Sequence, residues 1–87
     1  MKILMWPIEM AAWFTQEGVI NPIRYRVTSD QSEPSVVKID KVILRTEEKL
    51  AGNKMIIFRC QSVINGLQKV YEVKYEIGTC RWFLFKM

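Results

Sequence analysis

The chain has 87 residues, of which 49% are hydrophobic and 25% are charged, and this composition is typical of one small folded domain. It has no histidine and only two cysteines, which excludes histidine-based catalytic triads, histidine metal ligands and a four-thiolate metal site within one chain. Thirteen Lys and Arg against nine Asp and Glu give a net charge of +4, which is compatible with an acidic partner.

The sequence offers little for catalysis, cofactor binding or membrane insertion. The four glycines are far apart, so none belongs to a phosphate-binding loop, and no carboxylate pair has the pattern of a general acid and base. The apolar N-terminus is interrupted by Pro7 and followed by Glu9, so it is too short for a signal peptide or a membrane span. We therefore expect a cytoplasmic, non-catalytic protein that needs no cofactor or metal and does not enter a membrane.

Runs of β-branched and aromatic residues lie between the spaced glycines, which is typical of a small all-β domain. The pattern predicts one domain of about six antiparallel strands, curled into a small barrel or a strongly twisted sheet. The expected strands cover residues 8–14, 23–28, 35–45, 55–64, 67–77 and 80–87.

The second expected strand carries a basic pair on its solvent side. Apolar residues alternate with Arg24 and Arg26, which indicates a half-buried strand. The two arginines either hold a phosphate or form a solvated edge that discourages strand pairing. The polar segment 28–34 that follows is expected to be a flexible loop.

The third expected strand changes phase between 37–39 and 42–44, and the polar pair Asp40-Lys41 lies at the change. A β-bulge at this pair would keep both apolar sets on the core side, and the alternative is burial of both faces after Lys41. Residues 46–50 have helical character and predict a single helical turn, with Ala51-Gly52 as its stop.

The C-terminal third predicts a three-stranded meander. Asn65-Gly66 is the signal for a two-residue type I′ hairpin, which sets Ile64 opposite Leu67. Gly78-Thr79 predicts a second two-residue turn. Both registers place opposite charges across from each other, with Arg59 facing Glu72 and Glu76 facing Arg81.

The same registers separate the two cysteines by about 20 Å of strand, at about 3.3 Å per residue. A disulfide requires Cα atoms within about 7 Å, so two reduced thiols are expected. Cys60 is interpreted as a small buried hydrophobic residue.

The outer side of the meander interleaves aromatic rings with cations, which resembles the stacking platforms of proteins that bind single-stranded nucleic acid. Two other interpretations stay open. The N-terminal segment with Trp6 and Trp13 covers these rings, or the rings form a homodimer contact. The candidate binding residues are Phe83, Phe85, Lys74, Arg59 and Arg81, with Arg24 and Arg26 as the second basic feature.

The segment 13–26, with the letters WFTQEGVINPIRYR, resembles the opening of a set of small uncharacterised all-β proteins from Firmicutes. Segments 38–42, 51–60 and 81–84 also fit, so the resemblance covers residues 10–87 and leaves residues 1–9 as an N-terminal extension. Similar short β domains with the Pro-aliphatic-Arg-aromatic pattern accompany Y-family DNA polymerases, and this resemblance implies an accessory role in DNA repair.

Taken with the residue pattern, the expected function is a non-catalytic binding module whose favoured partner is nucleic acid or a nucleic-acid enzyme. The alternative is a self-associating structural or protein–protein adaptor domain. The salt dependence of binding distinguishes these two functions. Phosphate contacts weaken steeply as the salt concentration rises, whereas an apolar interface barely responds.

Overall fold

The computed structural model describes residues 1–28 and 35–87. The fold is all-β, as predicted: one antiparallel sheet of seven strands in the order β3-β2-β1-β7-β6-β5-β4. Most of the loop expected at 28–34 lies outside the described residues. The strands are β1 (Ile3–Phe14), β2 (Ile20–Val27), β3 (Ser35–Lys38), β4 (Lys41–Leu50), β5 (Asn53–Ile64), β6 (Leu67–Glu76) and β7 (Arg81–Lys86).

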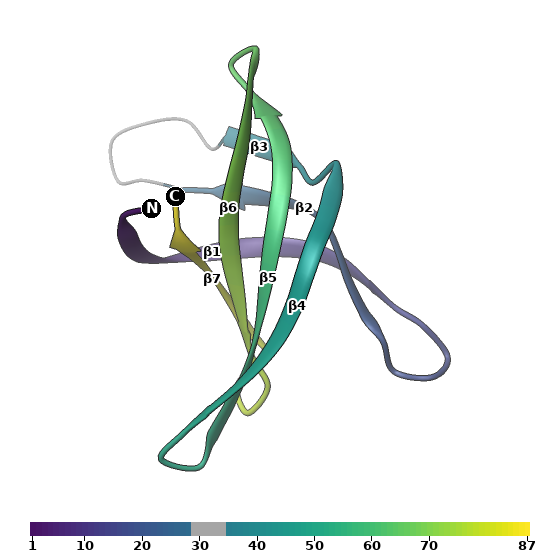
Figure 1. Ribbon diagram of the computed structural model, residues 1–87. Coiled ribbons are helices and arrows are strands. Elements are labelled where there is room, and N and C mark those ends of the chain that lie inside the picture. Colours follow the sequence, from purple (N-terminus) through teal and green to yellow (C-terminus); the bar gives the residue numbers. More distant parts are fainter. Residues whose placement is uncertain (29–34) are drawn as a thin grey trace.

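The sheet curls into a half-barrel in which β1 and β2 cross behind β5 and β6 (Figure 1). The long strand β1 makes this possible because it belongs to both parts of the sheet. Its first half, from Ile3 to Ile8, pairs with β7, and its second half, from Glu9 to Phe14, pairs with β2. Most of the segment expected as an N-terminal extension is thus part of the sheet.

The third expected strand is divided at Ile39 and Asp40, which form a corner between β3 and β4. The Ile39 N–H donates to the Ile23 carbonyl on β2, and the Asp40 N–H donates to the Gln61 carbonyl on β5, each at 2.9 Å. Consecutive amides therefore bond to two strands that are far apart in the strand order, each the second strand from an edge of the sheet. The bulge expected at Asp40-Lys41 lies instead between Val42 and Leu44 of β4, so Val42 packs on the core but Leu44 is exposed.

The helical turn predicted at 46–50 is wrong, because these residues continue β4 alongside β5. Ala51 and Gly52 do not stop a helix. They form a two-residue turn with φ angles of 49° and 84° and set Leu50 opposite Asn53. Positive φ at both central residues is the type I′ geometry, which alanine disfavours because its Cβ crowds the backbone there.

The C-terminal meander has the predicted register between β5 and β6, and between β6 and β7 from Arg81 to Leu84. Asn65 and Gly66 have φ angles of 51° and 77°, and β5 pairs with β6 without interruption along its length. The second hairpin keeps its expected pairing of Glu76 with Arg81, but its turn has four residues, 77–80, rather than two. The register also shifts at Phe85, so Glu72 lies opposite Lys86.

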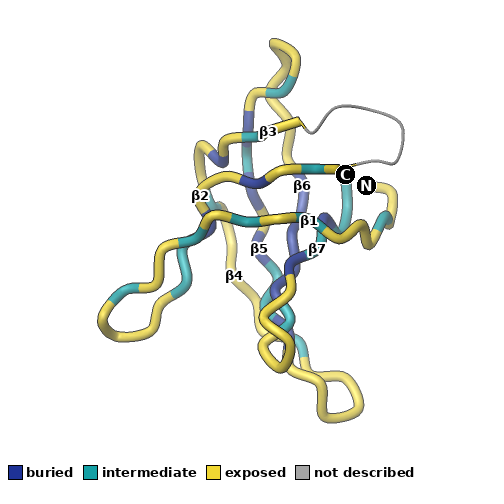
Figure 2. Tube along the Cα trace, turned by 180° about the vertical axis from the view of Figure 1, so that it is seen from behind, coloured by how far each residue is buried: buried dark blue, intermediate teal, exposed yellow. Residues whose placement is uncertain are grey.

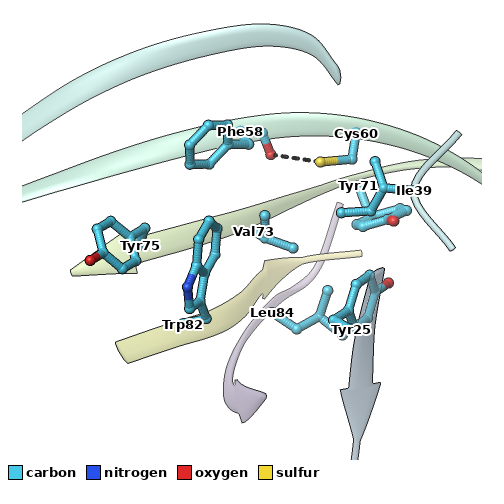
Figure 3. Packing of buried hydrophobic residues seen from close by; sticks show 9 residues of the cluster. All are labelled: Tyr25, Ile39, Phe58, Cys60, Tyr71, Val73, Tyr75, Trp82 and Leu84. Carbon is cyan, nitrogen blue, oxygen red and sulfur yellow. Dashed lines mark hydrogen bonds between the residues drawn. The ribbon is translucent and has the colours of Figure 1, made fainter. Parts of the chain in front are cut away.

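The core lies between the two crossing parts of the sheet and is mainly aromatic (Figures 2 and 3). Trp82 lies between Phe58 and Tyr75, with ring centroids 5.5 and 4.7 Å away. Tyr25 of β2 meets Tyr71 of β6 edge to face at 5.8 Å, which ties the crossing strands together. The buried residues of the cluster are Tyr25, Ile39, Phe58, Cys60, Tyr71, Val73, Tyr75, Trp82 and Leu84.

The two cysteines are free thiols, as predicted. Cys60 is fully buried in the core, where burial raises the pKa of its thiol to about 12. Cys80 is exposed in the four-residue turn. The thiolate is the reactive form, so only Cys80 is placed to react in the folded protein.

Labelling with a thiol-specific maleimide at neutral pH is expected to modify Cys80 in the native protein and Cys60 only after unfolding, because Cys60 is both buried and protonated. Intact-mass measurement follows the two additions. A Cys80→Ser variant should remain unlabelled until urea is added, and equal native labelling at both positions would contradict the burial of Cys60.

Replacing Ala51 by Asn is expected to raise the free energy of unfolding by up to about 1 kcal/mol, because asparagine tolerates the left-handed conformation better than alanine. Gly66→Ala should lower it by about 1–2 kcal/mol for the converse reason. Urea denaturation measures both, and Ala11→Asn is the control at a strand position without positive φ. A stabilisation as large in Ala11→Asn as in Ala51→Asn would refute the turn-based explanation.

Candidate nucleic-acid interface

The register brings the predicted aromatic and basic residues of the meander together on its outer side, here called the meander face. Lys74 lies opposite Phe83, and Arg59 lies opposite Glu72. Phe83 and Phe85 are half-buried and Arg81 is exposed. The meander face is therefore defined by Phe83, Phe85, Lys74, Arg59 and Arg81.

The cations of the meander face are engaged within the protein itself. Lys74 is only 6% exposed, and its Nζ lies 2.9 Å from Oε2 of Glu48 and 3.8 Å from the centroid of the Phe85 ring. Lys86 approaches the same ring at 4.8 Å, and Arg81 lies 5.4 Å from the Phe83 ring. A nucleobase that stacked on Phe85 would compete with these cation–π contacts.

Carboxylates neutralise the meander face further. Arg59 donates to the buried Glu72 carboxylate at 3.0 and 3.1 Å, as its predicted register requires. Glu76 faces Arg81 across the strands, but its carboxylate accepts from Thr79 at 2.5 Å and from Asn53 at 2.8 Å. The Thr79 hydroxyl and the Asn53 amide together hold the pKa of Glu76 below its ordinary value.

The expectation that Trp6 and Trp13 cover the meander face is wrong. Trp6 pairs with the buried Leu84, so the N-terminal segment lies beside β7 within the sheet rather than over its outer side. Trp6 is 50% exposed and Trp13 is 62% exposed. The hydrogen-bonded pairing of β1 with β7 fixes the place of the N-terminal segment. The alternation of apolar and polar residues along the strands could not predict this pairing.

A second outer surface, formed by β1, β2 and β3 and here called the cationic face, has a different charge pattern. Arg24 lies directly opposite Lys38 of β3, and both side chains are exposed. Arg26 is neutralised, because its Nε and Nη2 donate to the Glu9 carboxylate at 2.7–3.0 Å. Among the described residues, neither Arg24 nor Lys38 has a carboxylate partner.

Trp13 belongs to the cationic face. It is two residues beyond Ala11 on β1, so both side chains point to the same side of the sheet, and Ala11 is the direct neighbour of Arg24. The short side chain of Ala11 leaves a hollow of about 280 Å³ between the flanking arginines. The hollow is lined by Glu9, Met10, Ala11, Arg24, Tyr25, Arg26 and Val36.

Sequence reasoning named Arg24 and Arg26 but missed Trp13 and Lys38 as members of this surface. Arg45 does not belong to this surface: its guanidinium donates to the Ile20 carbonyl and to Oδ1 of Asn21 and lies over the Phe58 ring. Two features of the sequence could have indicated that Trp13 and Lys38 belong to this surface. One is the alternation that sets Ala11 and Trp13 on the same side of their strand, and the other is pairing of the second expected strand with the third.

Searches against family models, curated proteins and solved structures returned no match to this chain. The resemblance to the Firmicutes proteins and to the domains that accompany Y-family polymerases therefore stays a prediction. Over residues 1–28 and 35–87, no helix has the length and apolar character that a membrane-spanning helix requires. In that same part of the chain, no three acidic or thiol side chains gather in the way a metal site needs.

Replacing Glu48 by Gln is expected to lower the free energy of unfolding by about 1–3 kcal/mol, because the buried ammonium of Lys74 loses its counter-charge. Thermal or urea unfolding measures the loss. The neighbouring Glu47→Gln is the matched control, since Glu47 is exposed and should change stability by less than about 0.5 kcal/mol. Equal effects of the two variants would show that the Lys74–Glu48 pair contributes little to stability.

Proposed function

We propose that this protein is a non-catalytic module that binds nucleic acid through the cationic face. The proposal rests on the Arg24–Lys38 pair, which lies directly opposite across two strands on the surface that also exposes Trp13. Like charges directly opposite in a sheet are destabilising, and a phosphate between them would relieve the repulsion.

The Arg24–Lys38 pair differs from an ordinary basic patch because the aromatic ring of Trp13 is exposed on the same surface. Lys49 and Lys54 are also directly opposite, near the tip of the β4–β5 hairpin, but no exposed aromatic side chain lies beside them on the paired strands. At the cationic face, Trp13 offers a ring for an unstacked base while Arg24 and Lys38 meet the backbone phosphates. This arrangement favours single strands over duplexes, because the bases of a duplex are already stacked.

The resemblance to domains that accompany Y-family DNA polymerases supports the same partner class and suggests an accessory role in DNA repair. The meander face remains a second candidate for this binding. Its contacts favour it less, since Lys74 and Arg59 are paired with carboxylates and the Phe85 ring is in contact with two ammonium groups.

Binding of a fluorescent oligothymidylate, measured by anisotropy over a series of salt concentrations, tests the proposal. Arg24→Ala and Lys38→Ala should each reduce the slope of log K against log salt by about 0.7, because each removes one phosphate contact with a single strand. Trp13→Ala should weaken binding by about 1–3 kcal/mol, which is the cost of one lost stacking contact.

Lys54→Ala is the matched control, because it removes the same charge from a like-charged cross-strand pair at the other end of the molecule (Figure 1). It should leave the salt slope unchanged. A slope that falls equally in Lys54→Ala and Arg24→Ala would mean that binding follows net charge alone, and would refute the site. Loss of binding in Phe83→Ala and Phe85→Ala, with Trp13→Ala unaffected, would assign the site to the meander face instead.

The alternative function, a self-associating or protein–protein adaptor domain, is favoured by one observation. Phe14 and Val19, beside Trp13, leave the β1–β2 hairpin with exposed apolar side chains on a segment that projects from the body of the sheet (Figure 1). Sedimentation at several salt concentrations separates the two functions. Association through this hairpin persists at high salt, whereas a nucleic-acid complex dissociates.

A further inference from the structure

A groove separates the free edge of β3 from the tip of the β5–β6 hairpin, and Figures 1 and 2 both place these segments side by side. The hollow between them has a volume of about 350 Å³. It exists because the corner at Ile39 and Asp40 holds β3 close to β5, while β3 pairs with β2 alone among the described strands. The groove is lined by Ser35, Val36, Val37, Lys38, Val63, Ile64 and Asn65.

The β3 wall of the groove presents backbone groups that have no partner in the described part of the chain. Ile39 bonds to Ile23, and the hydrogen-bonding residues of an antiparallel edge alternate, so Val37 bonds to β2 as well. The backbone groups of Val36 and Lys38 therefore point away from β2 and into the groove. This is the pattern that accepts an additional strand.

The β5 wall of the groove also presents backbone groups that point away from the neighbouring strand β6. The Asn65-Gly66 turn sets Ile64 to hydrogen-bond with Leu67, so the backbone groups of Val63 point away from β6. The Val63 N–H donates to Oδ2 of Asp40 at 3.1 Å. Its carbonyl has no hydrogen-bond partner among the described residues, so an acceptor faces the groove from this side as well.

We propose that this groove binds an extended acidic peptide of a partner protein, which adds as a strand along β3. A lone strand satisfies backbone groups on both walls. A second copy of this chain is a less suitable occupant, because its net charge is +4 and the cations Lys38 and Arg24 flank the groove. This site is distinct from the nucleic-acid binding proposed above, although Lys38 contributes to both surfaces.

The side chains of the groove define the chemistry of the peptide. Val37 and Ile64 are half-buried against the core, so inward positions of the peptide should be apolar. Lys38 lies on the outer side with Arg24 directly opposite, so an outward position should carry a carboxylate. The exposed Val36 and Val63, at 65% and 61%, extend the apolar contact at the rim.

The test uses a capped synthetic peptide of about eight residues in which valine alternates with glutamate, titrated into the isotope-labelled protein and followed by NMR. Saturable binding with slowed hydrogen exchange at the Val36 and Lys38 amides is the expected result. A peptide with lysine in place of glutamate should bind at least about tenfold more weakly, which corresponds to about 1.4 kcal/mol.

Val36→Pro removes an edge N–H without removing a bond to β2, and should weaken binding of the valine–glutamate peptide at least about tenfold. Lys49→Pro is the matched control, because residue 49 is an outward-facing position on the opposite edge strand β4. The Tyr71 and Val73 amides of β6 report whether each variant is folded. If Val36→Pro unfolds, Lys38→Glu replaces it and should reverse the preference between the two peptides.

The proposal is overturned by any of three results: no saturable binding at about 1 mM peptide, slowed exchange at β4 amides rather than at β3, or equal weakening in Val36→Pro and Lys49→Pro. An unchanged peptide preference in Lys38→Glu would also overturn it. Oligothymidylate binding is measured separately, on the wild-type protein without peptide, because Lys38 contributes to both surfaces. Failure of the groove then does not decide the nucleic-acid function.

Discussion

The shape of this protein depends on the corner at Ile39 and Asp40. These two consecutive residues donate their amide hydrogens to carbonyls near opposite ends of the strand order, Ile23 on β2 and Gln61 on β5, each of which is the second strand from an edge. The Asp40 carboxylate reinforces the corner by accepting the Val63 amide. Because the bonds join β2 and β5 to one short segment, the sheet is held curled and β3 is held in place beside β2, where it supplies Lys38 to the cationic face.

The aromatic core follows from the same constraint. Curling brings β2 behind β6, so the large rings of Tyr25 and Tyr71 meet at the centre of the molecule. The Tyr71 hydroxyl shares a hydrogen bond of 2.6 Å with Ser62. The Tyr25 hydroxyl is buried without a partner among the described residues, and burial raises its pKa. Burial of its ring offsets the cost of this unpaired hydroxyl.

The C-terminal meander could be predicted from sequence because local chemistry determines it. Asparagine and glycine adopt the positive φ angles of a type I′ turn at little cost, and the turn then sets every partner on the two strands. The β4–β5 hairpin was missed because its turn begins with Ala51, a residue that seldom adopts this conformation, and because Glu47-Glu48-Lys49 has helical propensity. Pairing with β5 overrides that propensity, and single-segment patterns do not report such pairing.

The candidate site shows the same division between local and long-range information. The strand register correctly placed Arg59 opposite Glu72, but the partner of Lys74 is Glu48, two strands away on β4. No periodicity in the meander reveals that contact, since it depends on which strand lies beside β5. Likewise, Lys38 joins Arg24 only through the pairing of β2 with β3.

Charge pairing on the two outer faces supports different roles for them. Glu9 with Arg26, Arg59 with Glu72 and Lys74 with Glu48 are complementary pairs that the folded chain satisfies by itself. Arg24 and Lys38 instead bring two cations together beside an exposed tryptophan, where stability alone would favour a carboxylate. Since Glu9 of the adjacent strand β1 neutralises Arg26, which is two residues from Arg24 on β2, the fold can place a carboxylate at this surface. The lack of a carboxylate partner for this pair among the described residues supports the proposal that the cationic face binds an anionic ligand.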